Sequence, residues 1–299
     1  MFTRPPLTTR NGIPRYVEDD GYAESFGEQW NRWRRVQLDS VTGKPISRDR
    51  LFEGSRWPED LSGETVLELG CGAGRFTEVL LAAGAEVWAI DASSAVDAAL
   101  ANLGEHERLH VAQADLFDLP FEPGAFDRVL CFGVIQHTPE PRRAFLTACS
   151  FGGELAADVY RTQPYVDRWS AKTLWRPLTR RMSRERLRRV VEWYVPRWLP
   201  VDTRLARVPK LGRFLTAAVP CWNYTGLLPL DEKELRAWAV LDTFDALSPS
   251  FDEPQTLETV QAWVREAGLE DADVRYGGNG IVVTGRRPRG PASRTSAPR

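Results

Sequence analysis

The chain has 299 residues, of which 42% are apolar and 27% charged, and its formal net charge at pH 7 is −2. This is an ordinary globular composition, and the small net charge gives no reason to expect DNA as a partner. No apolar run approaches the length of a membrane span, the first residues lack a signal-peptide core, and the four cysteines are far apart. We therefore expect a cytoplasmic protein without a disulfide framework.

Residues 1–63 are expected to form an N-terminal arm that carries one helix. The first 15 residues are polar and rich in proline, so we expect them to be poorly ordered. Over 20–38, aromatic residues recur at intervals of four, four and three, which predicts a helix with one aromatic face: Tyr22, Phe26, Trp30 and Trp33. Such a face can pack on the core, close over a ligand as a lid, or do both. The spacing leaves open which of Gln29, Trp30 and Trp33 would touch a ligand.

From residue 64 onward, short apolar runs alternate with helical spacing. The pattern predicts strands at 64–70, 86–91, 109–114, 126–132 and 154–160, with helices at 74–83, 93–103 and 139–149. Alternation of this kind predicts a parallel sheet covered on both faces, with ligands beyond the carboxyl ends of its strands. We therefore expect an α/β core over residues 64–160.

The first strand of this core is expected to end in a glycine turn. Gly70, Gly72 and Gly74 follow an apolar run, and a helical pattern starts directly after them. Glycines at such a turn let the backbone bend sharply and let a ligand approach closely. Arg75 stands where the nicotinamide fingerprint G-x-G-x-x-G has its last glycine, so that fingerprint is not met. Asp91 ends the next strand, 21 residues after Gly70, where a carboxylate can hold a ribose diol.

Four segments within 64–160 together resemble the class I S-adenosylmethionine (SAM) dependent methyltransferases: VLELGCGAGRF, VWAID, QADLFDLPF and FDRVLCFGVIQHTPEP. The nearest group is the small-molecule set that includes the ubiquinone-biosynthesis O-methyltransferases. The resemblance implies SAM as cofactor and a Rossmann-like sheet of seven strands, the last one antiparallel, with an N-terminal lid helix. Residues 11–17 resemble the tail of a zinc ribbon found in some relatives, but its cysteines are absent, so we predict no metal.

The resemblance also implies contacts with the cofactor, residue by residue. By this analogy Glu68 orients the methionine end of SAM, Asp115 holds the adenine amino group, and Leu116 packs on the ring. A buried carboxylate such as Glu68 is costly unless paired, and we expect a backbone group or a lysine as its partner. For Asp115 the alternative is a role as a turn cap. The expected cofactor-binding residues are Glu68, Gly70, Gly72, Gly74, Asp91, Asp115, Leu116 and Phe132.

The chemistry is expected in residues 131–139, which in relatives border both cofactor and acceptor. Methyl transfer is an in-line displacement at carbon, so orientation of the nucleophile contributes most, roughly 7–11 kcal/mol. A hydroxyl or phenol must also lose a proton, and histidine is the side chain whose pKa needs the least adjustment for that step. His137 is therefore our candidate base. The alternative is that His137 only orders the loop through a backbone hydrogen bond.

Residues 161–253 break the alternation and are predicted to form a mostly helical insertion that binds the acceptor. Within 161–214 there are 15 Lys/Arg against 4 Asp/Glu, accompanied by tryptophans. Three interpretations stay open: a solvated helix face, a site for a phosphate- or sugar-bearing acceptor, or contact with an anionic membrane surface. Residues 241–255 are predicted to be a turn-rich loop. The segment resembles one in relatives from polysaccharide and natural-product pathways, which implies a hydroxylated acceptor. Asp245 or Tyr224 is within reach of that acceptor or serves only the loop structure.

Residues 254–286 are expected to complete the sheet. A helix is predicted at 256–267, followed by a hairpin of strands at 270–276 and 280–285. The tail 287–299 is rich in arginine, proline and serine and is predicted to be disordered.

Together these features predict a SAM-dependent methyltransferase that moves a methyl group to an oxygen of a small, glycosylated or phosphate-bearing metabolite in a biosynthetic pathway. One alternative is N- or C-methylation of a natural-product intermediate. The others are a nicotinamide-dependent oxidoreductase, which Arg75 disfavours, and a non-enzymatic protein that binds SAM, RNA or a membrane. The identity of the acceptor and the oligomeric state stay open.

Overall fold

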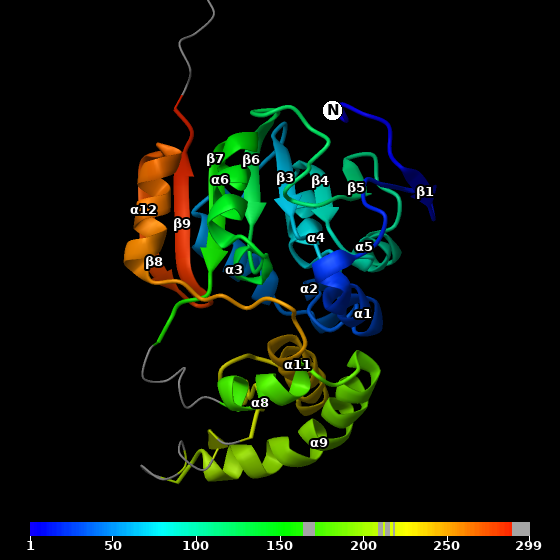
Figure 1. Ribbon diagram of the computed structural model, residues 1–299, viewed down its shortest axis with the longest axis vertical. Helices are drawn as coiled ribbons and strands as arrows, with labels where there is room; N and C mark the ends of the chain where they lie inside the picture. Colours follow the sequence, from blue (N-terminus) through cyan, green and yellow to red (C-terminus); the bar gives the residue numbers. More distant parts are fainter. Residues whose placement is uncertain (164–170, 209–211, 213–215, 218, 289–299) are drawn as a thin grey trace, which may run out of the picture.

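The computed structural model describes residues 1–163, 171–208, 212, 216–217 and 219–288. A central sheet with helices on both faces occupies one side of the molecule, and a layer of helices lies across one end of it (Figure 1). The prediction of a disordered tail falls mainly on 289–299, outside the described residues, as does Trp169 of the basic segment.

The sheet has nine strands in the described part of the chain, in the order β1-β2-β5-β4-β3-β6-β7-β9-β8. The strands are β1 (Thr8–Arg10), β2 (Ile13–Arg15), β3 (Thr65–Leu69), β4 (Glu86–Asp91), β5 (Leu109–Gln113), β6 (Phe126–Cys131), β7 (Gly152–Val159), β8 (Glu270–Gly277) and β9 (Gly280–Arg286). β5, β4, β3, β6 and β7 are parallel, and β9 is antiparallel to both of its neighbours. The seven strands from β3 to β9 confirm the predicted core, including the antiparallel last strand.

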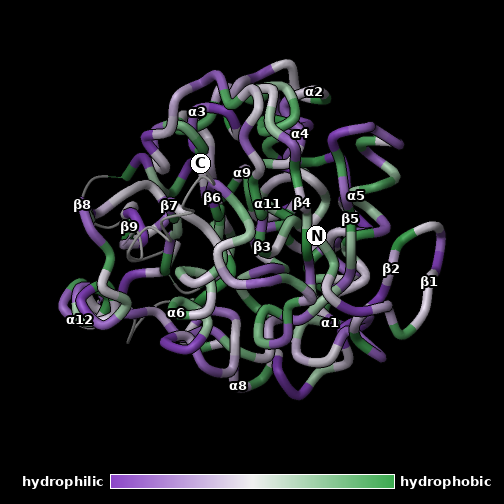
Figure 2. Tube along the Cα trace, turned by 90° about the horizontal axis from the view of Figure 1, so that it is seen from above, coloured by the Kyte–Doolittle hydropathy of each residue, from purple (hydrophilic) through white to green (hydrophobic). Residues whose placement is uncertain are grey.

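Helices cover both faces of this sheet because its central strands are apolar on both sides. On β3, Leu67 and Leu69 face α6 (Pro141–Phe151) and α12 (Leu257–Ala267), while Val66 faces α3 (Ile46–Ser55) and α4 (Arg75–Ala82). α5 (Ala95–Leu103) adds to the second face. Figure 2 shows, from above, hydrophobic segments near the labels of β3 and β6 in the middle of the molecule, as expected for strands buried on both sides.

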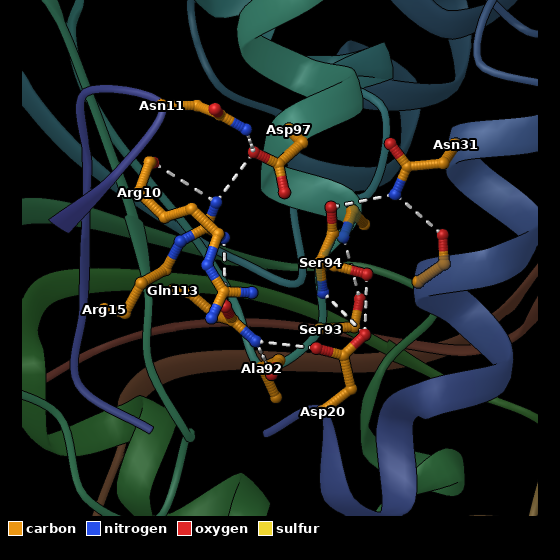
Figure 3. A network of polar contacts seen from close by, with 12 residues as sticks. Arg10, Asn11, Arg15, Asp20, Asn31, Ala92, Ser93, Ser94, Asp97 and Gln113 are labelled. Atoms are coloured by element: carbon orange, nitrogen blue, oxygen red, sulfur yellow. Dashed lines mark hydrogen bonds and ion pairs between the residues drawn. The ribbon is translucent and has the colours of Figure 1, made fainter. Parts of the chain in front are cut away.

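The N-terminal residues were expected to be poorly ordered, and that expectation is wrong. β1 and β2 form a hairpin around Asn11 and Gly12, both with positive φ (54° and 77°), and Arg15 of β2 pairs in parallel with Gln113 of β5. The hairpin is held by the buried Arg15 side chain, which donates to Asp97 Oδ1 (2.7 Å) and Gln113 Oε1 (2.9 Å), as Figure 3 shows. Asn-Gly is the preferred pair for a two-residue hairpin turn, so the sequence carried this signal.

The predicted aromatic helix over 20–38 is shorter than expected. A 3-10 turn, η1 (Gly21–Ala23), leads into α1 (Glu24–Arg32), and a short α2 follows at Asp39–Thr42. Asp20 anchors the start of this segment, because its carboxylate accepts from Ser94 N and Oγ (2.9 and 2.6 Å) and from Gln113 Nε2 (2.9 Å), as Figure 3 shows. α1 is thereby tied to the loop that follows β4.

We use the name helical layer for α8 (Ala171–Thr179), α9 (Arg184–Leu205) and α11 (Glu232–Leu247), which Figure 1 shows below the sheet. α9 and α11 share a hydrophobic core of their own, which includes Leu187, Val191, Phe244 and Leu247. The turn-rich loop predicted from residue 241 is wrong for its first half, because α11 continues to Leu247. The apolar face that packs on α9 outweighs the turn formers, which begin at Ser248.

Two arginines of the basic segment help to dock the helical layer on α1. Arg184 pairs with Glu24, Arg188 with Glu28 (3.1 Å), and Arg32 of α1 with Glu192 of α9 (3.0 Å). Within the described residues, no helix combines the length and the apolar character needed to cross a bilayer.

Candidate functional site

A cavity of about 1480 Å³ opens between the carboxyl ends of the parallel strands, α1 and the helical layer. A pocket for a single small ligand usually measures about 300–1,000 Å³, so this cavity has room for two ligands side by side. Among the predicted site residues, those that line it are Gly70, Gly72, Asp91, Leu116, Phe132 and His137. From α1 and the turn before it, Tyr22, Phe26 and Trp30 line it, whereas Gln29 and Trp33 turn toward α11.

The glycine turn after β3 forms the floor of the cavity. Gly70 and Gly72 have φ values of 75° and 53°, a region that side chains rarely adopt. A Cβ at Gly70 would lie 2.2 Å from Val134 Cγ2, and one at Gly72 would lie 3.1 Å from the Trp30 ring. The lid aromatic therefore sits directly against the turn. Gly74 lies behind it, where a Cβ would meet Leu103, and does not line the cavity.

Asp91, at the end of β4, is the buried carboxylate beside this turn. Its Oδ2 accepts from Gly72 N (3.0 Å), and its Oδ1 accepts from Ser93 N and Oγ (2.8 and 2.7 Å). Burial raises the pKa of Asp91, and these three hydrogen bonds oppose the rise. The donors fix the carboxylate at the cavity wall. Oδ1 already accepts two bonds and Oδ2 only one, so Oδ2 keeps a lone pair for a ligand hydroxyl.

Asp115 follows β5 and is partly committed to local structure. Its Oδ1 accepts from Phe117 N (3.0 Å), the bond of a turn cap, and from Tyr22 Oη (3.2 Å). Asp115 does not line the cavity, whereas its neighbours Ala114 and Leu116 do. The predicted adenine wall is therefore apolar here, and the Asp115 carboxylate lies behind Tyr22.

Glu68 lies within β3, 2% exposed, and does not line the cavity. Its partner is the Thr77 hydroxyl, which donates to Oε2 at 2.6 Å. The expectation of a backbone or lysine partner is therefore wrong, because α4 crosses β3 with this threonine facing it. Burial raises the pKa of Glu68 to about 8, with the nearby Asp91 charge acting in the same direction.

His137 ends the turn η2 (Ile135–His137) and is 5% exposed at the cavity wall. Its Nδ1 lies 3.1 Å from the Phe251 carbonyl oxygen, and its ring contacts Phe26 and Tyr160. A carbonyl only accepts, so Nδ1 carries the proton in the neutral ring and Nε2 keeps a free lone pair. Burial lowers the pKa of His137, which favours this neutral form, while Asp245 and Asp252 oppose the shift.

The helical layer contributes acidic and basic groups to the cavity, including the predicted Asp245. Asp242 of α11 accepts from Gln37 Nε2 (3.0 Å) and from the Tyr224 hydroxyl, and burial raises its pKa to about 7. Asp245, one turn further, accepts from Gln29 Nε2 (2.9 Å). The contacts with Gln37 and Gln29 join residues 205 and 216 positions apart, so no local pattern could have indicated them.

Basic residues of α8 and of the turn after it line the cavity on the side of the helical layer. Lys172, Arg176 and Arg180 share one helix face, and Asp252 pairs with Lys172 at 2.6 Å. Arg176 is engaged mainly in structure, because it donates to the carbonyl oxygens of Ala246 and Pro249 (3.1 and 3.0 Å).

The features of the cavity fit SAM. The backbone of the glycine turn lines the floor at Gly70 and Gly72, the Asp91 carboxylate accepts from Gly72 N beside it, and the wall at Ala114 and Leu116 is apolar. Aromatic rings from α1 also line the cavity, and their faces would stabilise the sulfonium cation of SAM. These are the features of a Rossmann-like nucleotide site without the nicotinamide fingerprint.

Comparisons with known proteins agree. Residues 67–150 match the family described as a methyltransferase domain. The chain is 25% identical over 260 residues to a demethylmenaquinone methyltransferase of Clavibacter sepedonicus, covering 85% of both. It is 37% identical over 136 residues to a ubiquinone biosynthesis O-methyltransferase of Aromatoleum aromaticum, covering 44% of this chain and 57% of that one. This chain thus spans little more than half of the second relative.

The fold has a counterpart among solved structures. A chain of the complex between the Haloferax volcanii Trm112 methyltransferase activator and a methyltransferase aligns with a TM-score of 0.52 and 13% identity, covering 89% of this chain and 99% of that one. The matched family, the relatives and the sheet topology together show a class I SAM-dependent methyltransferase. The match over residues 67–150 and the curated relatives support SAM as its cofactor.

Proposed function

We propose that this enzyme transfers the methyl group of SAM to a hydroxyl or phenol oxygen of a small metabolite, with His137 as the base. The observation that carries the proposal is the hydrogen bond between His137 Nδ1 and the Phe251 carbonyl, which leaves Nε2 free to accept a proton at the cavity wall. The lowered pKa keeps the ring neutral near pH 7, as a general base requires. When bound, SAM supplies the electrophilic methyl group.

The residues of the sheet edge would hold the cofactor. Asp91 Oδ2 would accept from a ribose hydroxyl, the glycine turn at Gly70 and Gly72 would lie under the methionyl chain, and Leu116 would pack on the adenine. Trp30, pressed against the glycine turn, would cover the sulfonium and exclude water. Glu68, Gly74 and Asp115 lie one layer behind these groups and would act through them, Asp115 by positioning Tyr22.

The acceptor would occupy the half of the cavity that faces the helical layer. Aromatic residues Phe26, Tyr160, Trp222 and Trp238 line that half, which suits a flat, partly apolar molecule. The relatives named for ubiquinone and menaquinone biosynthesis support an aromatic acceptor with a hydroxyl group. A phosphate or other anionic group on the acceptor has less support, since Arg184 and Arg188 pair with glutamates, whereas Lys172, Arg176 and Arg180 are among the basic residues that line the cavity.

A second candidate is N-methylation of an amine. Asp242 and Asp245 both line the acceptor half and could bind a protonated nitrogen before it loses its proton. The two candidates differ in which acceptors react.

The test is turnover measured as release of S-adenosylhomocysteine (SAH) with a panel of phenols, catechols, aliphatic alcohols and amines. We expect product only with oxygen acceptors, at a rate that depends on His137. Turnover with amines alone would favour the second candidate. Binding of SAH without turnover on any class would refute both.

A further inference from the structure

One cation in the cavity has no counter-ion. Arg75, the first residue of α4, directly follows the glycine turn and lines the cavity. Its Nε donates to Ser47 Oγ and its Nη1 to Gln37 Oε1, both at 2.9 Å, and both acceptors are neutral. Throughout the described part of the chain, no carboxylate forms an ion pair with Arg75, and Nη2 has no acceptor.

The surroundings disfavour an unpaired cation at this position. Burial and the nearby Arg50 charge lower the pKa of Arg75 to about 9, although the charges of Asp242 and Asp39, neither of which forms an ion pair with it, oppose the shift. Arg50 has its own carboxylate, Asp158 at 2.8 Å, so it shares none with Arg75. Arg75 also stands at the N-terminus of α4, where the helix dipole favours an anion rather than a cation. A bound anion would offset all three effects.

The guanidinium is held in a fixed orientation. It lies over the Phe76 ring at 5.0 Å and over the Trp238 ring at 5.6 Å from the ring centres. Stacking of this kind, together with the bonds to Ser47 and Gln37, keeps the planar fork in place before a ligand arrives. Such a fork matches the geometry of a carboxylate.

We propose that Arg75 binds the α-carboxylate of the methionyl part of SAM. The inference rests on SAM lying along the sheet edge as proposed above. Along this edge Asp91 ends β4, the glycine turn follows the neighbouring strand β3, and Arg75 comes directly after the turn. A ligand whose ribose is held at Asp91 extends its amino-acid end across the turn and toward Arg75.

The test compares SAH with its decarboxylated analogue by isothermal titration calorimetry. In Arg75→Gln we expect affinity for SAH to fall about 10- to 100-fold, the effect of losing a charge-assisted pair. The affinity for the decarboxylated analogue should stay within about twofold of wild type, because it lacks the group that Arg75 binds. Arg48→Gln, which removes an exposed arginine paired with Glu59, is the matched control and should change neither affinity.

Three results would overturn the inference: an equal loss for both compounds, no loss for either, or a change confined to the KM of the acceptor. If Arg75→Gln does not fold, Arg75→Lys keeps the charge without the fork, and its selective loss of SAH affinity supports the inference while unchanged SAH affinity overturns it. Failure of the wild type to bind SAH would instead refute the proposed function, so the two failures are distinguishable.

Discussion

Asp91→Asn is the substitution with the most direct consequence for cofactor binding. The carboxylate has donors on both oxygens, Gly72 N on one and the Ser93 groups on the other. An asparagine side chain keeps an oxygen for only one of them and turns an NH₂ group toward the other. The negative charge that would bind the ribose through Oδ2 is lost as well.

The magnitude follows from these contacts. A hydrogen bond to a charged group contributes about 1.5–3 kcal/mol, so losing the charge at the ribose weakens SAH binding about 10- to 100-fold. The mismatched donor inside the protein costs about 1–3 kcal/mol of unfolding free energy in the apo state. The two effects are separable because one is measured with ligand and the other without it.

Calorimetry with SAH and urea unfolding of the apo protein provide the two measurements. Asp118→Asn is the control, because the Asp118 side chain is 66% exposed and lies outside the cavity lining. The reasoning is refuted if Asp91→Asn binds SAH within about twofold of wild type while the apo protein loses stability as expected. That result would make Asp91 a purely structural residue of the turn.

Three other substitutions test separate parts of the molecule. His137→Ala should lower kcat by about 10²–10⁴-fold and abolish the acid limb of the pH–rate profile, which in wild type falls below a pKa under 6.5; an unchanged profile would exclude a base at this position. The melting temperature of Glu68→Gln should increasingly exceed that of wild type as pH rises from about 5 to 8. The reason is that the pKa of Glu68 is about 8 when folded, so wild type loses the stability of the protonated form across that window; parallel curves would contradict this. Arg15→Ala should cost roughly 2–4 kcal/mol of unfolding free energy by leaving Asp97 unpaired, whereas the exposed Arg4→Ala should cost less than about 1 kcal/mol, and equal losses would count against the buried pair.

The parts of the fold that sequence could predict are those governed by short-range patterns. β4 has the predicted bounds of 86–91, and the antiparallel last strand was expected. The hairpin at Asn11–Gly12 was missed although its turn signal is local, because the polar composition of the segment was given more weight. The end of α11 was predicted as a loop, because the apolar face of this helix can be recognised only from its packing on α9.

In the candidate site, too, local sequence could place some residues, whereas tertiary packing brings the others together. Asp91 and the glycine turn lie on consecutive strand ends, so spacing alone placed them together. The partner of Glu68 depends on how α4 crosses β3, and the acidic residues of α11 meet α1 only through tertiary packing. The need of Arg75 for a counter-ion emerges only from its burial, which a sequence pattern does not record.

The ion pairs between α1 and α9 have a kinetic consequence. Arg188–Glu28 and Arg32–Glu192 fasten the lid helix to the helical layer, so α1 cannot swing away alone without breaking them. Cofactor exchange then requires either a hinge motion of the whole layer or the rupture of these bridges. Partly exposed charge pairs weaken with added salt. If exchange requires rupture of these ion pairs, the residence time of SAH should therefore shorten at high ionic strength. If the whole layer moves as a hinge, the residence time should not shorten.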